Sequence, residues 1–369
     1  MRILYYSKEE NNFMWQWQRY HIFNELAHHG CFFYLLDPSY FSSWDMANEK
    51  LLETLKANHY DLLMTPYGDG AIYIYTLKEI KKIGVPSLLF CPDNNTIPFH
   101  FKNVCSHFDL VWLTSPDTEY LFKRWGAKTT FLPLAANPYM ISPTFGNEIE
   151  KVCFIGTPHG TRPNMLNTLL DNKIDLCLYS KMKEETKQTT NNVEANSHLK
   201  LQGAGTIDYL KFYIGRKILL AKIISKLFHN NLLKINSPKL EIRDPLPFDE
   251  IYQSYSKYAL SISSVTARNT SVLKNPVYLI VLRNFEIPMS GGLQICQYCQ
   301  ELSEYFEEDK EIIFYRSEEE LVDKAKYYLR SENYSVRLSI KQAARHRAEK
   351  EHTWYHRFEK IFKRLNIKP

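Results

Sequence analysis

Short apolar segments alternate with amphipathic helical segments through the first 135 residues, and this alternation limits the possible fold more than any other feature. Each apolar segment has the length of a buried strand, and each segment between them repeats its apolar residues at helical spacing. Strands and helices that alternate in this way form βαβ units, whose strands pair in parallel with right-handed crossovers. The segments expected as strands are RILYY (2–6), FFYLLD (32–37), YDLLMTPYG (60–68), VPSLLFCPD (85–93), FDLVWLT (108–114) and TTFLPLA (129–135).

The same plan restarts after residues 137–150, where Pro, Gly, Ser and Asn cluster and the apolar periodicity lapses, as it does in interdomain linkers. KVCFIG (151–156) is expected as a strand, followed by a glycine-bearing turn and a helix over 156–170. IDLCLYS, ALSISS and EIIFY are expected as later strands, and residues 293–306 as a helix. A second parallel sheet follows from this pattern.

The chain is thus predicted to be α/β, with two Rossmann-like domains that face each other across a cleft. Its 369 residues suit two domains better than one core. We expect the first domain over 1–144, the second over 145–345, and a last helix over 346–369 that crosses back to brace the first domain.

Composition points to a reduced, intracellular environment. No apolar run approaches the ~18 residues that a membrane span needs, and the first residues lack the apolar core of a secretory signal. The seven cysteines are odd in number and scattered, and Cys296 and Cys299 form a single pair without the further ligands of a zinc site. We expect a cytoplasmic protein with buried thiols and no metal site.

The net charge of +5 is concentrated in one stretch, because residues 206–236 hold six bases and one acid. We expect 181–205 to be a loop and 207–234 to be a basic amphipathic helix, which forms an insertion in the second domain. Three interpretations stay open for this helix: a lid over a ligand, a face that contacts anionic membrane at the inner surface of the cell, or a buried helix with snorkelling bases.

The turn GTPHGTR, from Gly156 to Arg162, lies between a predicted strand and a predicted helix. The backbone N–H groups of such a turn, the helix dipole and the Arg162 guanidinium can hold a phosphate. Gly156, Thr157 and Arg162 are therefore candidate contacts, with an ordinary βα turn as the alternative. The spacing G-x-x-x-G is not that of a dinucleotide-binding fingerprint.

Glu286 is a single carboxylate in an apolar segment that ends at Gly291 and Gly292. A carboxylate near a helix start can accept two hydrogen bonds from the vicinal hydroxyls of a ribose, and glycines allow a ligand to approach the backbone. The alternative is a surface pair between Glu286 and Arg283 beside a plain turn.

Three other residues are candidates by position. Lys257 and Arg162 can neutralise a diphosphate, as fixed cations do where charge develops on a leaving group. Arg283 belongs to the same set, or else it orients Glu286. Asp93 ends a predicted strand of the first domain and is our candidate for orienting or deprotonating an acceptor hydroxyl, with a turn cap as the alternative.

Three segments together resemble one known family: RNFEIPMSGG (283–292), ELSEYFEEDKEIIFYRSEEELVDKAKYYL (301–329) and RHRAEKEHTWYHRF (345–358). Their order and spacing are similar to the C-terminal signature of the CgeB-like (spore-maturation type) glycosyltransferases, and the resemblance is strong over about residues 250–360. It implies a GT-B fold with a nucleotide-sugar donor on the C-terminal domain and an acceptor on the N-terminal domain.

The resemblance also implies a metal-independent hexosyltransferase that uses no cofactor and acts on a saccharide, lipid-linked or protein hydroxyl, as for a cell-envelope glycan. Glu286 matches the ribose-binding Glu of related retaining enzymes. Tyr278 stands where those enzymes have a second Glu that contacts the sugar, so the sugar and the stereochemical outcome stay open.

Two other functions remain possible on the sequence alone. A nicotinamide-dependent oxidoreductase uses the same kind of fold, but the missing G-x-G-x-x-G disfavours it. A non-catalytic nucleotide-sugar or glycan-binding protein would explain Tyr278. Nucleic-acid binding is disfavoured, because the chain outside 206–236 is neutral overall and shows no reader motif.

Overall fold

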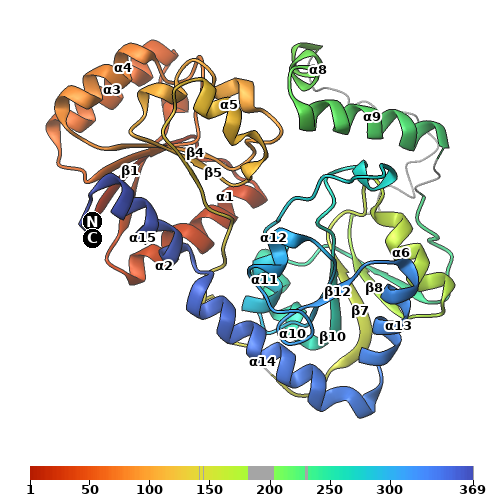
Figure 1. The fold of residues 1–369 in the computed structure, drawn as a ribbon. Coiled ribbons are helices and arrows are strands. Elements are labelled where there is room, and N and C mark those ends of the chain that lie inside the picture. Colours follow the sequence, from red (N-terminus) through yellow and green to blue (C-terminus); the bar gives the residue numbers. More distant parts are fainter. Residues whose placement is uncertain (141, 144, 182–202, 229–231, 369) are drawn as a thin grey trace. The chain divides into compact units, whose positions relative to one another are not determined.

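The computed structural model describes residues 1–140, 142–143, 145–181, 203–228 and 232–368, with backbone alone for 203–206. The chain forms two compact units, each with its own sheet (Figure 1). The first unit is Met1–Asn137 with Thr353–Pro369, and the second is Pro138–His352. The boundaries expected after residues 144 and 345 therefore move to 137/138 and 352/353.

The first unit is built on a six-stranded parallel sheet in the order β2-β1-β3-β4-β5-β6. Every segment expected as a strand in this part of the chain is one: β1, β3, β4 and β5 are buried apolar runs, whereas β2 is an apolar edge strand whose side chains are partly exposed. The strands are β1 (Arg2–Tyr6), β2 (Phe32–Leu36), β3 (Leu62–Thr65), β4 (Ser87–Cys91), β5 (Leu110–Leu113) and β6 (Thr129–Phe131).

The helices of the first unit follow the strands in βαβ order. The helix after β1 contains a π-helical turn over Gln18–Phe23, which divides it into α1 and α2. The α-helices are α1 (Phe13–Trp17), α2 (Asn24–His28), α3 (Trp44–Ala57), α4 (Ile74–Ile83), α5 (Glu119–Arg124) and α15 (Trp354–Leu365), with 3-10 turns at Pro38–Tyr40, Pro98–Phe101, Cys105–His107 and Pro116–Thr118.

The second unit has another six-stranded parallel sheet, in the order β12-β11-β10-β7-β8-β9. Residues 293–306, expected as a helix, form β11 and the short α12 instead, because a brief apolar run suits a central strand as well as a buried helix. The strands are β7 (Ile149–Ile155), β8 (Leu176–Tyr179), β9 (Leu240–Arg243), β10 (Tyr258–Ser263), β11 (Gln294–Gln297) and β12 (Ile313–Tyr315).

The basic segment expected as one helix over 207–234 is two helices, α8 and α9, that break at Lys211–Phe212 and form a hairpin. The expected loop over 181–205 lies almost entirely outside the described residues. The helices of the second unit are α6 (Arg162–Asp171), α8 (Gly203–Leu210), α9 (Tyr213–Phe228), α10 (Phe248–Lys257), α11 (Arg283–Met289), α12 (Gln300–Ser303), α13 (Glu318–Tyr328) and α14 (Tyr334–Glu351), with 3-10 turns at Thr270–Val272 and Ser331–Asn333.

One buried carboxylate in each unit fixes a C-terminal helix. In the second unit, Glu148 accepts from Arg337 Nε at 2.7 Å and from Lys341 Nζ at 2.6 Å, which ties α14 to the start of β7. In the first unit, Glu25 accepts from the backbone N–H groups of Trp354 (3.0 Å) and Tyr355 (2.7 Å) at the N-terminus of α15. The last helix thus packs in the first unit, beside α2, as expected (Figure 1), but it begins at Trp354 rather than near residue 346.

Strand order places one switch point in each sheet. In the first sheet, β1 lies between β2 and β3, as in flavodoxin-like sheets. Read from β9 to β12, the second sheet has the 3-2-1-4-5-6 order of Rossmann sheets, with the reversal between β7 and β10. Ligands of open α/β sheets bind outside the strand carboxyl ends at such points, so the loops after β1, β7 and β10 are the expected places for a ligand.

Candidate functional site

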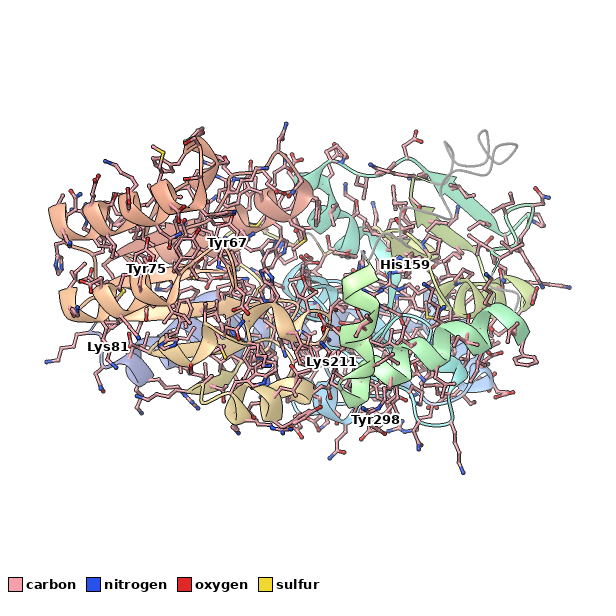
Figure 2. All side chains as sticks on the ribbon, turned by 90° about the horizontal axis from the view of Figure 1, so that it is seen from above. Tyr67, Tyr75, Lys81, His159, Lys211 and Tyr298 are labelled. Atoms are coloured by element: carbon pink, nitrogen blue, oxygen red, sulfur yellow. The ribbon has the colours of Figure 1, made fainter. Side chains whose placement is uncertain are left out.

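The turn after β7 and the loop after β10 meet at the switch point of the second sheet. Gly160 adopts φ +68° and lies against Asn269, so that a Cβ at Gly160 would come within 2.6 Å of Asn269 Oδ1. The Thr161 hydroxyl donates to the Arg268 carbonyl at 3.4 Å. This turn contains His159, one of the residues labelled in Figure 2. The two loops form one rim at the carboxyl edge of β7 and β10.

Arg283, the first residue of α11, reaches this rim and lies directly over Gly156. Gly156 has φ +129°, and a Cβ on it would collide with the Arg283 guanidinium, so only glycine leaves room for the arginine. Arg283 also lies above the Phe154 ring, with its guanidinium carbon 5.9 Å from the centroid.

Arg162, at the start of α6, is the second cation of the rim. Its pKa is lowered to about 10, first by burial and then by the positive charge of Arg283. Arg162 Nη1 donates to the Thr157 carbonyl at 3.3 Å. Within the described part of the chain, neither arginine forms an ion pair. Two neighbouring guanidinium groups at a helix N-terminus favour an anion with several oxygens.

Glu286 lies one helical turn beyond Arg283 in α11, and only 5% of it is exposed. Tyr252 donates to Glu286 Oε1 at 3.3 Å, and Arg283 hydrogen-bonds Tyr255. Burial, and next the charge of Glu286, raises the pKa of Tyr252 far above its usual range. A surface pair between Glu286 and Arg283 is wrong, because the carboxylate is buried among tyrosines.

Gly291 and Gly292 pack against the protein itself. Gly291 has φ +70°, and a Cβ on it would come within 2.6 Å of Pro143 Cβ. A Cβ on Gly292 would come within 2.9 Å of Ile287 and 3.0 Å of Tyr255. The close approach that these glycines allow is to neighbouring side chains, which corrects the expectation that they receive a ligand.

Lys257 lies at the other edge of the sheet. It is the last residue of α10 and directly precedes β10, so it stands at the amino end of a strand whose carboxyl end forms the rim. A strand of this length extends roughly 17–20 Å, beyond the reach of one lysine side chain. Lys257 is therefore removed from the candidate site, whereas Thr157 stays as an exposed residue of the turn.

Two residues near the rim were not among the contacts expected from the sequence, although Tyr278 was recognised as replacing a Glu of related enzymes. Arg268 is exposed, adopts φ +48° and lies 6.0 Å from the ring centroid of Tyr209. The sequence feature that could have indicated Arg268 is its position as a basic residue shortly after the predicted strand ALSISS. Tyr278 pairs with Thr266 in an isolated antiparallel bridge within the loop that follows β10. Burial, and next the neighbouring Cys299, raises the pKa of Tyr278.

A hollow of about 710 Å³ adjoins the loop after β1 in the first unit. Its size is typical of small-molecule pockets. Glu9 Oε1 accepts from Trp15 Nε1 and from Arg19 Nη1, both at 3.2 Å. The π-helical turn carries Arg19 and Tyr20, and such turns are frequent at functional sites. The remaining lining residues are polar or aromatic: Glu10, Asn11, Gln16, Asn24 and Tyr40.

Asp93 follows β4, as expected, and is exposed in a turn. Its carbonyl accepts from the backbone N–H groups of Thr96 (2.9 Å) and Ile97 (3.2 Å). The buried residue of this turn is the next one, Asn94, whose amide donates to the Ser115 carbonyl and the Thr118 hydroxyl, both at 2.8 Å. Asp93 does not line the hollow after β1.

No group of three His, Cys, Asp or Glu side chains among the described residues is arranged to hold a metal ion. None of the helices among these residues combines the length and the apolar character that a membrane crossing requires. All seven cysteines are buried, as expected.

Comparisons with known proteins agree with this architecture. Residues 216–363 match the model of a family described as glycosyl transferase-like. No curated protein matches the chain at a significant level. Among solved structures, a glycosyltransferase from Rickettsia africae is similar with a TM-score of 0.58 and 11% identity, over 100% of this chain and 99% of that one.

Two further structures are similar over nearly their whole length. The Anabaena HepE protein, solved in complex with UDP and glucose, has a TM-score of 0.56 and 13% identity, with 99% of each chain covered. Sucrose-phosphate synthase from Thermosynechococcus elongatus has a TM-score of 0.55 and 11% identity, again with 99% of each chain covered. These similarities confirm the predicted GT-B fold, and the family model matches the C-terminal part of the chain.

Proposed function

We propose that the chain transfers a sugar from a nucleoside-diphosphate sugar and holds the donor at the rim after β7 and β10. The observation that carries this proposal is the pair of neighbouring cations at the rim, Arg283 over Gly156 and Arg162 at the start of α6. A diphosphate offers both guanidinium groups acceptor oxygens, and the N-terminus of α6 adds its dipole. The similar HepE protein was solved with UDP, which supports a donor of this class.

Glu286 binds the donor ribose in this proposal. A carboxylate oxygen accepts hydrogen bonds only, as it does from Tyr252 at 3.3 Å, and the two vicinal hydroxyls of a ribose are donors of the same kind. Tyr252 and Tyr255 hold Glu286 and Arg283 in one cluster, which gives the ribose and the diphosphate a fixed spacing.

The transfer proceeds without a metal ion in this proposal, because Arg162 and Arg283 supply positive charge where the leaving diphosphate becomes more negative. Preorganised cations in a partly buried site stabilise such charge without reorganisation. Turnover that is unchanged by a chelator is the expected result, and its loss with restoration by a divalent cation would contradict this step.

The acceptor is a hydroxyl of a saccharide, free or linked to a lipid or protein, bound at the hollow after β1. Aromatic rings beside carboxylates, carboxamides and an arginine provide stacking and hydrogen bonds for a hydroxyl-rich ligand. We place the chain with the CgeB-like subtype on its C-terminal motifs, and we retain a hexose as the transferred sugar.

A non-catalytic binding protein is the second candidate, because Tyr278 stands where related enzymes have a Glu. It predicts that a nucleotide sugar binds and that no nucleoside diphosphate is released with any acceptor. Measured release of the diphosphate in the presence of oligosaccharides separates the two candidates.

The test is a binding panel of UDP, GDP, CDP and dTDP against the wild type and the double variant Arg162→Gln/Arg283→Gln. A hydrogen bond to a charged group contributes about 1.5–3 kcal/mol, so loss of two should weaken the best ligand by about 100-fold or more. Lys257→Gln is the matched control, since it removes one cation at the opposite edge of the same sheet. Equal affinity of the wild type and the double variant would refute the donor site.

A further inference from the structure

The hairpin of α8 and α9 (residues 207–228 where side chains are described) exposes apolar side chains in an unusual concentration. Figure 1 shows the hairpin as a layer outside the sheet of the second unit, and Figure 2 labels Lys211 at its bend. Six large apolar residues of the hairpin are between 51% and 77% exposed: Ile207, Leu210, Leu220, Ile223, Leu227 and Phe228. Contiguous exposed apolar surface marks an interaction site.

The two faces of α9 account for this exposure. Ile214, Ile218 and Ala221 are buried, and they recur at helical spacing on the face that packs toward the second unit. Leu220, Ile223 and Leu227 recur on the opposite face, so the helix is apolar both inward and outward. A helix that only covered its own domain would need a polar outer face.

Positive charge borders the outward apolar stripe. Residues 207–228 contain five bases and one acid, Asp208, which pairs with Lys211 at 2.6 Å. Lys222 and Lys226 are one turn apart on the flank of the stripe, and neither forms an ion pair within the described ranges. Apolar side chains flanked by lysines form the pattern of helices that lie in a membrane interface.

We infer that this hairpin docks the protein on an anionic phospholipid surface, with Leu220, Ile223 and Leu227 inserted at the headgroup boundary and Lys222 and Lys226 against lipid phosphates. The inference concerns a surface away from the rim and is independent of the proposed reaction. The sixteen residues of α9 are about 24 Å long, short of the ~30 Å apolar core of a bilayer, so the helix lies on the membrane.

A lipid surface fits better than a second copy of the chain. In a symmetric dimer the same patch faces itself, which would bring Lys222 and Lys226 of one copy close to the same lysines of the other. Anionic headgroups instead attract each lysine near the surface, and the acyl boundary accepts the apolar stripe.

The test is co-sedimentation of the full chain with vesicles of phosphatidylglycerol and phosphatidylcholine in equal parts, and with phosphatidylcholine alone. We expect binding only to the anionic vesicles, and weaker binding at high salt. Lys222→Gln/Lys226→Gln should lower partitioning by about thirtyfold, and Ile223→Ser/Leu227→Ser by at least as much. Lys78→Gln/Lys81→Gln, on exposed positions of α4, is the matched control and should bind as the wild type does.

All variants are first checked for wild-type unfolding midpoints, which exposed positions should preserve. Absence of sedimentation with anionic vesicles would overturn the inference, and so would equal binding by all three double variants. A concentration-dependent dimer that Ile223→Ser/Leu227→Ser dissociates would overturn it as well, because the stripe would then be covered by a second copy.

Discussion

Each sheet has one switch point, and the two differ in their chemistry. After β7, Arg283 lies over Gly156 and Arg162 stands next to it at a helix start, which suits a polyanion. After β1, a π-helical turn presents an arginine and aromatic rings, with carboxylates and carboxamides nearby, which suits a hydroxyl-rich ligand. The sheet determines where a ligand binds, and the side chains after the strands determine which ligand it is.

The largest predicted effect destabilises the second unit, which contains the switch point between β7 and β10, and leaves the first unit unchanged. Glu148→Ala leaves Arg337 and Lys341 buried without their carboxylate, which should cost about 3–5 kcal/mol of the free energy of unfolding. All six tryptophans belong to the first unit, so their fluorescence should report an unchanged transition while circular dichroism shows earlier unfolding of the second unit. Coincident shifts of both signals would show that the two units unfold together.

The next prediction acts at the rim itself. Gly156→Ala forces the Arg283 guanidinium away and strains a backbone with φ +129°, so nucleoside diphosphate binding should weaken about tenfold or more, which corresponds to loss of one charge-assisted hydrogen bond. Gly84→Ala is the control, because its φ is +88° and a Cβ there meets no atom within 4 Å. If isothermal titration shows that Gly156→Ala binds the nucleoside diphosphate with unchanged affinity, Arg283 does not contact the donor.

A smaller effect is predicted at the switch point of the first sheet. Tyr20→Ala removes a half-exposed ring from the hollow after β1 and should raise the KM for a saccharide acceptor by about three- to tenfold, the range for one aromatic contact of 0.5–1.5 kcal/mol. The dissociation constant for the donor nucleotide should not change. Tyr75→Ala, an exposed tyrosine on α4, is the matched control, and an equal rise in KM for both variants would remove the hollow from the acceptor site.

The last prediction concerns pH and the first unit. Burial raises the pKa of Glu25 from 4.5 to about 7, so the folded state holds the extra proton and the free energy of unfolding falls as pH rises between these values. Glu25→Gln cannot ionise and lacks this pH dependence. The unfolding midpoint of the variant minus that of the wild type, detected by tryptophan fluorescence, should therefore increase by several degrees between pH values below 4.5 and above 7.

A midpoint difference that does not change with pH would contradict this origin. If the midpoint of Glu25→Gln instead increases relative to the wild type as the pH falls, the hydrogen bonds from Trp354 and Tyr355 favour the ionised Glu25 more strongly than burial disfavours it. The buried His21 is present in both proteins, so its titration cancels in the difference.

The strands of both sheets were largely predictable, because buried parallel strands are continuous apolar runs. Two strands were missed, β9 and β11. The edge strand β9 (LEIR) is short and only partly buried, and β11 shares its composition with a buried helix, from which only its pairing with β10 and β12 distinguishes it. The extent of α9 was also predictable in outline. Its outward apolar stripe was not, because helical spacing does not say which face meets the protein.

The candidate site was predictable in residue type more than in contacts. Arg162 and Glu286 were found from the turn and the isolated carboxylate. That Arg283 lies over Gly156 depends on the spatial meeting of α11 and the turn after β7, which local sequence does not encode. The ligand contacts expected of three residues were misplaced: Gly291, Gly292 and Lys257. A glycine pair can serve packing as readily as ligand binding, and the sequence around a lysine does not indicate at which edge of the sheet it lies.

The most direct test of the central claim is hydrogen exchange of the intact protein with and without the nucleoside diphosphate that binds best. The donor site predicts slowed exchange in residues 156–162, 264–270 and 283–289, with no change in residues 9–20 after β1. Protection confined to residues 9–20, or no protection at the rim under saturating nucleotide, would contradict the assignment of the donor to the second switch point.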